Sequence, residues 1–400
     1  MKVWEKENKL RIKGVVMIKR QNGYVLKKIK GTAYLLPYGQ NIADQKRGLI
    51  FNETGELIWN FLDEGKTLEE ITEEVAAYYK IPVSDREELG KDVEDFVSQL
   101  LGMGILKEEL KKGNEPFYHC MEIGGICVKM CGQAEIFPKQ FVSFFCEEKE
   151  ADQTIEVKVA VPVSKPNGKV LIRNKEMSIC EWDEGYLVLF HQMKNVIEGY
   201  MTKDGNYVRI HALMPQNEEE KDNLFHAIRL FYLYLAQKKG LYAIHSASIL
   251  YRNRAWLFSG HSGMGKSTHT ALWHKLFHTP YLNGDLNLIG LEDGELKVYG
   301  MPWCGTSGIY TRKTQELGGI VLLGRDNTDH LETLGDAEKI VRVMQRMISP
   351  AWTEEQMEKN LDFAKQIVEK SQVYYLKCTK ESSAVQPIKT QIDQLEENDK

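Results

Sequence analysis

Glycines, a lysine and hydroxyl residues are crowded into one short run in the second half of the chain. The run is Gly260, His261, Ser262, Gly263, Met264, Gly265, Lys266, Ser267 and Thr268. Glycines allow backbone dihedrals and close approaches that a Cβ would forbid, so successive N–H groups can point at one anion. A lysine adds a mobile positive charge, and a serine hydroxyl suits Mg²⁺. This spacing predicts a loop that cradles nucleotide phosphates, with ATP and Mg²⁺ as cofactors.

The sequence on either side predicts the elements that such a loop requires. Residues 255–259 have the composition of a short buried strand, and a helix is expected to open at Ser267 and run through Leu276. The field at a helix N-terminus favours bound phosphate. We therefore expect residues 260–268 to form the nucleotide-binding segment.

Two more residues that could do chemistry stand on the strands expected before and after this segment. His245 lies within the apolar run 242–249, and Asp285 lies within the run 281–289. A carboxylate at the end of an apolar strand is well placed for function. Asp285 could bind metal or accept a proton from a substrate hydroxyl, and His261 could contact phosphate. Three basic residues suit a phosphate by charge but are expected at the solvated surface: Arg312, Lys313 and Arg325.

The order of histidine strand, phosphate loop and acidic strand resembles the HPr kinase/phosphorylase superfamily, which is related to ATP-dependent phosphoenolpyruvate carboxykinases. The resemblance covers about residues 240–375 and implies an α/β P-loop kinase core that transfers the γ-phosphoryl of ATP to a serine. It also implies that His245, Lys266 and Asp285 are catalytic. Ser267 and Asp285 would be the metal ligands.

The chain departs from this family at two places. The family typically has adjacent acidic residues where this chain has Gly284 and Asp285. It often supplies another metal-binding carboxylate where this chain has residues 297–300, which contain none. Asp285 must therefore bind metal or accept the substrate proton, or another group must help. Phosphoryl transfer depends mainly on positioning and charge neutralisation, so one carboxylate does not exclude it.

The first hundred residues have a different pattern. Three β-prone runs, at 23–29, 32–37 and 48–52, precede a change to helical periodicity. A helix is expected from Asn52, a second from the capping box of Thr67 and Glu70, and a third capped by Ser84. The sequence therefore predicts three strands and three helices, which would form a small α+β domain of winged-helix-like type.

That pattern resembles the PqqD-like peptide-recognition domain over about residues 15–107. The residues that carry the resemblance are 48–59, 62–71 and 92–97, with Gly104 and Ile105 closing the domain. The resemblance implies that the leader of a ribosomally made precursor peptide adds as a strand beside the third strand and against the third helix. The residues implied in this groove are Leu49, Phe51, Val93, Phe96 and Leu100. The simpler alternative for each of them is the core of the domain.

Taken together, these patterns predict four parts. They are a PqqD-like leader-peptide-binding domain (1–107), a β-rich accessory region (117–238), an HPr kinase-like catalytic domain (239–385) and a polar tail (386–400). The polar residues 107–116 would link the first two.

Composition excludes several classes of protein. A net charge of −5 argues against broad nucleic-acid binding. No apolar run reaches membrane-spanning length, and the N-terminus lacks a secretion signal, so a cytoplasmic protein is expected. Cys120, Cys127 and Cys131 lack the paired spacing of a metal site and are expected to be buried hydrophobic residues.

The sequence supports one function best and leaves two open. The best supported is an ATP-dependent kinase that binds the leader of a precursor peptide and phosphorylates a Ser or Thr on it. One alternative is a kinase for a small molecule such as serine. The other is a non-catalytic, ATP-gated chaperone that presents a peptide to another peptide-modifying enzyme. A homo-oligomer remains open.

Overall fold

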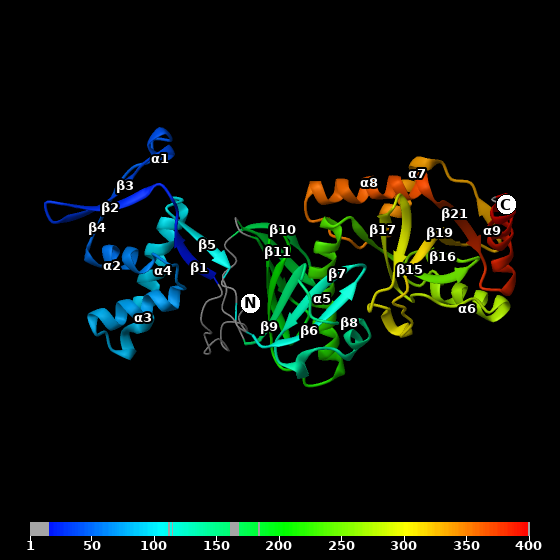
Figure 1. Cartoon of the computed structure of the whole chain (residues 1–400), viewed down its shortest axis with the longest axis horizontal. Helices are drawn as coiled ribbons and strands as arrows, with labels where there is room; N and C mark the ends of the chain where they lie inside the picture. Colours follow the sequence, from blue (N-terminus) through cyan, green and yellow to red (C-terminus); the bar gives the residue numbers. More distant parts are fainter. Residues whose placement is uncertain (1–15, 111–112, 114, 161–167, 183–184, 399–400) are drawn as a thin grey trace.

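The computed structural model describes residues 16–110, 113, 115–160, 168–182 and 185–398. These residues form three successive bodies along the longest axis of the molecule, in the order of the sequence (Figure 1). Within the described residues, no helix has both the length and the apolar character needed to cross a membrane.

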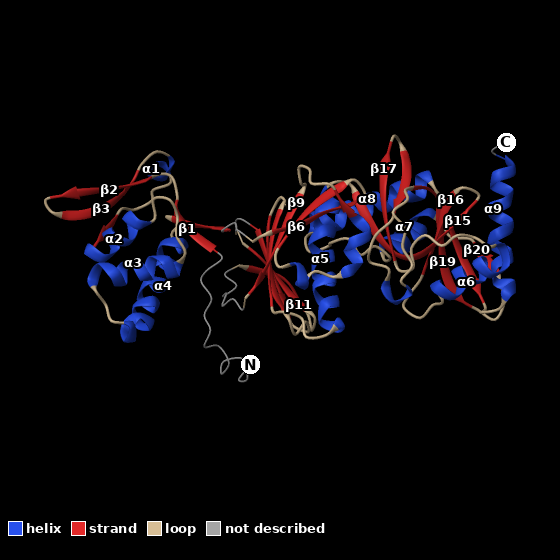
Figure 2. Ribbon diagram, turned by 60° about the horizontal axis from the view of Figure 1, so that its bottom comes forward, coloured by secondary structure: helices blue, strands red, loops and turns tan. Residues whose placement is uncertain are grey.

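The N-terminal body combines two small sheets with a group of helices. Its elements are β1 (Val16–Arg20), β2 (Tyr24–Ile29), β3 (Thr32–Pro37), α1 (Gln40–Ala43), β4 (Leu49–Phe51), α2 (Glu53–Phe61), α3 (Leu68–Tyr79), the 3₁₀ turn η1 (Val83–Asp85), α4 (Arg86–Gly102) and β5 (Leu106–Leu110). The first sheet has the order β2-β3-β4, and β1 pairs with β5 in the second. Figure 2 shows the helices packed beside the β2–β3 hairpin.

Two of the three N-cap residues predicted for this body cap a helix in the structure. The Asn52 side chain accepts a hydrogen bond from the N–H of Gly55, and Thr67 and Glu70 form a complete capping box. The expectation that Ser84 caps the third helix is wrong. Ser84 lies inside η1 and its hydroxyl bonds the Asp85 carboxylate, while α4 begins at Arg86 without a side-chain cap.

The middle body is a nine-stranded sheet with one long helix. Its elements are β6 (Phe117–Ile123), β7 (Ile126–Cys131), η2 (Ala134–Ile136), η3 (Lys139–Phe144), β8 (Phe145–Cys146), β9 (Gln153–Val159), β10 (Lys169–Arg173), β11 (Met177–Glu181), β12 (Gly185–Phe190), β13 (Val196–Thr202), β14 (Tyr207–Ala212) and α5 (Glu218–Lys238). The strand order is β10-β11-β12-β13-β14-β9-β7-β6-β8.

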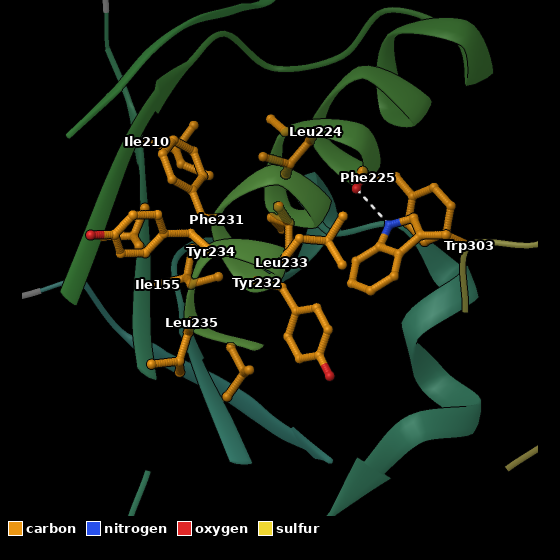
Figure 3. Close-up of a cluster of buried hydrophobic side chains, with 14 of the residues drawn as sticks. Ile155, Ile210, Leu224, Phe225, Phe231, Tyr232, Leu233, Tyr234, Leu235 and Trp303 are labelled. Carbon is orange, nitrogen blue, oxygen red and sulfur yellow. Dashed lines mark hydrogen bonds between the residues drawn. The ribbon is translucent and has the colours of Figure 1, made fainter. Parts of the chain in front are cut away.

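Helix α5 is buried over most of its length and joins the middle body to the C-terminal one. Phe231 and Tyr232 have no exposed surface, and they share a core with strands of both bodies. Figure 3 shows these side chains together with Trp303, whose indole N–H donates to the Phe225 carbonyl at 2.9 Å. The two bodies therefore share one continuous apolar core.

A polar contact holds the chain that connects the first two bodies. The N–H of Gly113 donates to Glu156 Oε2 at 2.9 Å and to the Tyr207 hydroxyl at 3.0 Å. Arg209 lies 3.4 Å from the same carboxylate. A Cβ at position 113 would lie 1.7 Å from Arg209 Nη2, so a larger residue here would require the Arg209 side chain to move. The connection is thus attached to the middle sheet.

The C-terminal body contains seven strands. Its elements are β15 (Leu241–Tyr251), β16 (Arg254–Ser259), α6 (Lys266–Phe277), β17 (Leu286–Glu292), β18 (Glu295–Tyr299), η4 (Gly305–Ser307), β19 (Gln315–Arg325), β20 (His330–Glu332), α7 (Asp336–Met344), α8 (Glu354–Lys370), β21 (Gln372–Cys378), η5 (Ser382–Val385) and α9 (Gln386–Asn398). The order is β16-β15-β17-β18-β19-β21-β20, and β16 also pairs with β19. Five strands therefore close into a ring, with β21 and β20 extending it.

The last residues are a docked helix where a polar tail was expected. Helix α9 runs to Asn398, and its Ile388 and Ile392 have no exposed surface. Both belong to a cluster with Trp256 and Phe258. The spacing of four residues places both isoleucines on one helix face, a pattern that the many charges of this segment concealed.

We expect Ile392→Ala to lower the unfolding free energy of the C-terminal body by about 2–5 kcal/mol, because it leaves a cavity in this cluster. Gln394→Ala, on the exposed face of α9, is the matched control and should change it by less than about 0.5 kcal/mol. Chemical denaturation measures both. Equal stability of the two variants would show that α9 does not dock.

Candidate active site

The glycine-rich loop, residues 260–265, connects β16 to α6 as the sequence predicted. The strand ends at Ser259 and the helix begins at Lys266, one residue before the expected start. Gly263 and Gly265 have φ values of +74° and +100°, which residues with a Cβ rarely adopt. The N–H groups at the start of α6 consequently lie next to the loop, as an anion-binding segment requires.

Lysine and arginine side chains concentrate positive charge at this loop. Lys266 is half-buried, and this burial lowers its pKa. Asp285 opposes the shift, whereas Arg346 adds to it. A second cation close enough to lower the pKa of Lys266 makes the site favourable for an anion.

Arg346 is a site residue that the sequence did not suggest. It follows α7, and its Nη2 lies 2.9 Å from Nε2 of His261 while its Nη1 lies 3.1 Å from Nδ1. A neutral imidazole accepts at only one nitrogen, so one of these contacts is a hydrogen bond. Because Arg346 lies in no motif and far from the loop in sequence, only the fold brings it here.

Arg325 is exposed, as expected, and it also contacts the glycine-rich loop. Its Nη2 donates to the Gly263 carbonyl at 2.5 Å. It ends β19, which runs parallel to β16. The carboxyl ends of parallel neighbours meet at one edge, so this arginine could have been found from the strand order. Arg312 and Lys313 are exposed, as expected.

His245 and Asp285 face each other beside the loop. Nε2 of His245 lies 3.0 Å from Oδ1 of Asp285, and each side chain is about one third exposed, at 34% and 37%. The backbone keeps this register, since Ser246 N–H donates to the Asp285 carbonyl at 2.9 Å. The hydrogen bond from His245 lowers the pKa of Asp285; burial opposes the shift, and the charges of Lys266 and Arg229 assist it.

The packing around Gly284 explains why position 284 has no side chain. A Cβ there would lie 1.9 Å from the Ser307 hydroxyl. The Gly284 N–H also donates to the carbonyl of Ile309 at 3.0 Å, which fixes this turn against the strand end. A second acidic side chain beside Asp285 does not fit in this arrangement.

The five residues implied in peptide binding divide into two groups. Phe51, Val93 and Leu100 are buried in the core of the N-terminal body, so the expectation that they line an open groove is wrong for this structure. The spacing of apolar residues in the sequence could not distinguish side chains that face the core from side chains that line a peptide-binding groove. Leu49 and Phe96 are half-buried, and the Phe96 ring meets Phe51 edge to face at 5.6 Å. Leu49 is on β4, which is an edge strand, and Phe96 on α4 reaches β4 through this ring contact.

Three cysteines of the middle body are packed in its interior. Cys120, Cys127 and Cys131 are all buried and free. Burial, with the neighbouring Cys120 and Cys146, raises the pKa of Cys127 to about 12, so its thiol stays protonated. Over the described ranges, no group of three or more His, Cys, Asp or Glu side chains is arranged to hold a metal ion.

Comparison with known proteins bears on the N-terminal body. The family model described as coenzyme PQQ synthesis protein D (PqqD) matches residues 43–106. This segment is PqqD-like. The match spans β4, α2, α3 and α4 of what we now call the PqqD-like domain. No curated protein matches the chain.

Two solved structures show partial similarity. TbiB1 in complex with the TbiA(beta) leader peptide is 26% identical over 22% of this chain and 94% of that chain, with a TM-score of 0.19. The Hpr(Ser) kinase/phosphatase from Coxiella burnetii is 13% identical over 23% of this chain and 70% of that chain, also with a TM-score of 0.19. At these TM-scores neither similarity bears on function.

We expect the carboxyl group of Asp285 to titrate below its ordinary value of about 3.9. In His245→Ala the midpoint should rise, because the hydrogen bond is lost while the burial remains. Carbon-13 NMR of protein labelled at aspartate carboxyls measures it, with Asp285→Asn providing the assignment. Since the folded-state pKa is depressed, the stabilisation from this carboxylate exists above the unfolded pKa and should disappear only below about pH 4. An unchanged midpoint in His245→Ala would contradict the pairing.

Proposed function

We propose that the protein is an ATP-dependent kinase that phosphorylates a Ser or Thr of a precursor peptide whose leader binds the PqqD-like domain. The observation that carries this proposal is the convergence of Lys266, Arg346 and the His245–Asp285 pair at one glycine-rich loop. Cations around the loop suit the phosphates, and the carboxylate beside them suits a hydroxyl acceptor.

The residues present fit a nucleotide. Gly263 and Gly265 adopt the positive φ values that let backbone N–H groups of the loop face a phosphate. Lys266 and Arg346 supply positive charge for the terminal phosphates. Ser267 is exposed in the first turn of α6, where its hydroxyl is available to a metal. Bound Mg²⁺–ATP would supply the phosphoryl group and neutralise its developing charge. Ser267 and Asp285 are the proposed metal ligands.

Asp285 is the proposed acceptor of the substrate proton. Its lowered pKa keeps it ionised at neutral pH, as a base requires. His245 holds one carboxylate oxygen by hydrogen bonding, which leaves the other oxygen for the hydroxyl or the metal. Most of the catalytic task is then to bring the hydroxyl into line with the phosphate.

The PqqD-like domain is proposed to capture the leader at β4. This strand has an open edge, and its Ile50 is 67% exposed. An extended peptide can add there through backbone hydrogen bonds, with Leu49 and Phe96 selecting its side chains. Capture raises the local concentration of the acceptor segment, so the kinase site itself need not bind tightly.

One observation favours a second candidate, the ATP-gated chaperone. Gly284 leaves Asp285 without an acidic neighbour, and the packing of Ser307 explains why. A protein of this kind would bind nucleotide without turnover, and its affinity for peptide would change with ATP. The absence of phosphate transfer together with such coupling would favour it over the kinase.

We expect Lys266→Ala to weaken Mg²⁺–ATP binding and to lower phosphate transfer at least about 100-fold, because it removes a preorganised charge. Calorimetry and transfer of labelled phosphate measure the two effects. Lys275→Ala, an exposed lysine on the same helix, is the control and should leave both unchanged. Were Lys266→Ala to behave like this control, the kinase proposal would fail.

We expect a precursor peptide to be phosphorylated at least about 100-fold more efficiently with its leader than without it, because the leader tethers the acceptor. Phe96→Ala should abolish most of this advantage by weakening leader binding. Ser98→Ala, exposed on the same helix, should preserve it. Steady-state kinetics and fluorescence anisotropy of a labelled leader measure these effects. Equal efficiency with and without the leader would disprove capture.

A further inference from the structure

A pocket of about 650 Å³ opens between α5 and the face formed by β10, β11 and β12. Its apolar wall includes Ile179 and Phe190 from the sheet, Leu230 and Leu233 from α5, and Trp352 from the loop before α8. Two groups of polar residues also line it. Asn223, His226 and Arg229 occupy successive turns of α5, and Asn174, Glu176 and Gln192 come from the ends of the strands. We call it the α5 pocket.

One stretch of backbone runs from the candidate active site to this pocket. Arg346 contacts His261 of the glycine-rich loop, and Ile348, Pro350 and Trp352 line the pocket. The stretch is fixed to β15, since His245 N–H donates to the Arg346 carbonyl and Ile348 N–H to the Ala243 carbonyl, each at 2.9 Å. The pocket and the site therefore share a wall that the sheet holds in place.

The charge of Asp285, in the candidate active site, affects ionisable residues that line the α5 pocket. Desolvation lowers the pKa of Arg229, and the Asp285 carboxylate opposes that shift. His226, one turn earlier on α5, is also affected by Asp285, although desolvation and Arg229 together lower its pKa. Asp285 thus lies within electrostatic reach of the proposed phosphate site on one side and of the pocket on the other.

Arg229 gives the pocket a preference for anions. The guanidinium is permanently charged and partly desolvated. Glu176 also lines the pocket but is exposed, and among the described residues no carboxylate lies within ion-pair distance of Arg229. A charge in such surroundings is stabilised by an anion that makes hydrogen bonds to it. A carboxylate matches the planar fork of the guanidinium.

The size of the pocket indicates how much of a substrate it can enclose. A volume of 650 Å³ lies within the range of sites that enclose a drug-sized molecule. A single side chain would leave much of it empty. Apolar walls with a few polar groups are typical of such binding sites.

We propose that the α5 pocket binds the acceptor segment of the substrate, an apolar peptide stretch next to the reactive hydroxyl that carries one carboxylate paired with Arg229. The proposal rests on the proposed function, because it places this segment beside Asp285. The leader would then be bound by the PqqD-like domain and the acceptor segment by the middle body. Both ends of the peptide would contribute to selection.

The test uses the full-length protein without nucleotide. A library of N-acetylated, C-amidated hexapeptides with a central serine and randomised flanks is incubated with the protein, and the retained peptides are identified by mass spectrometry. The wild type should enrich apolar residues together with Asp or Glu. The same library with free C-termini shows whether Arg229 pairs with an acidic side chain or with the C-terminal carboxylate of the peptide. If the C-terminal carboxylate can pair with Arg229, acidic side chains should no longer be enriched in this second library.

Two pocket variants and one control complete the design. Arg229→Gln should weaken binding of the selected peptides about 10- to 100-fold, and Arg229→Lys should restore part of it. Leu230→Trp fills the pocket and should remove the apolar selection. Arg173→Gln, an exposed arginine on β10, should change nothing. Melting temperature and Mg²⁺–ATP affinity confirm that each variant is folded.

The outcomes separate this inference from the kinase proposal. Selection that persists in both Arg229→Gln and Leu230→Trp, or no selection in either library, would overturn the role of the pocket. Phosphorylation of a precursor with an unchanged KM in both variants would do the same and leave the kinase intact. Selection by a wild-type protein that transfers no phosphate would disprove the kinase and the acceptor role, and would leave the α5 pocket as a peptide-binding site.

Discussion

Backbone pairing along β15 determines where the glycine-rich loop, the His245–Asp285 pair and Arg346 lie. Ser246 is paired with Ser259 at the end of β16, which places the glycine-rich loop. His245 is paired with Leu286 on the other side, which places Asp285. Ile244 forms a bridge with Met347, which places Arg346. Three segments, two of them far from β15 in sequence, are thus arranged around one strand, and the buried helix α5 supports that strand from the middle body.

The balance of charge at the site differs from that of the whole chain. The protein carries a net charge of −5. Around the glycine-rich loop, however, Lys266, Arg325 and Arg346 outnumber the carboxylate of Asp285. A local excess of positive charge within an acidic protein attracts a small polyanion and gives no extended basic surface for a nucleic acid. The charges around the glycine-rich loop, rather than the net charge of the chain, therefore indicate which ligand the site can bind.

Local chemistry could be predicted from the sequence, whereas long-range contacts could not. The loop between β16 and α6, the Asn52 cap and the capping box of Thr67 depend on residues a few positions apart, and the structure has all of them. Arg346 reaches His261 only through the pairing of distant segments. Phe51 showed the apolar character of both a groove and a core, and burial decided for the core. Ser307 explains Gly284 only once the two are seen in contact.

The attachment of Gly113 to the middle sheet constrains the geometry of any substrate held at both ends. Three peptide units separate Gly113 from Leu110 at the end of β5, a reach of at most about 11 Å. The end of β5 in the N-terminal body must therefore stay within this distance of Gly113. A peptide captured at β4 must itself span the remaining distance to the phosphoryl donor. The protein would act as a molecular ruler, and the number of residues between the leader and the acceptor hydroxyl would decide which hydroxyl is modified.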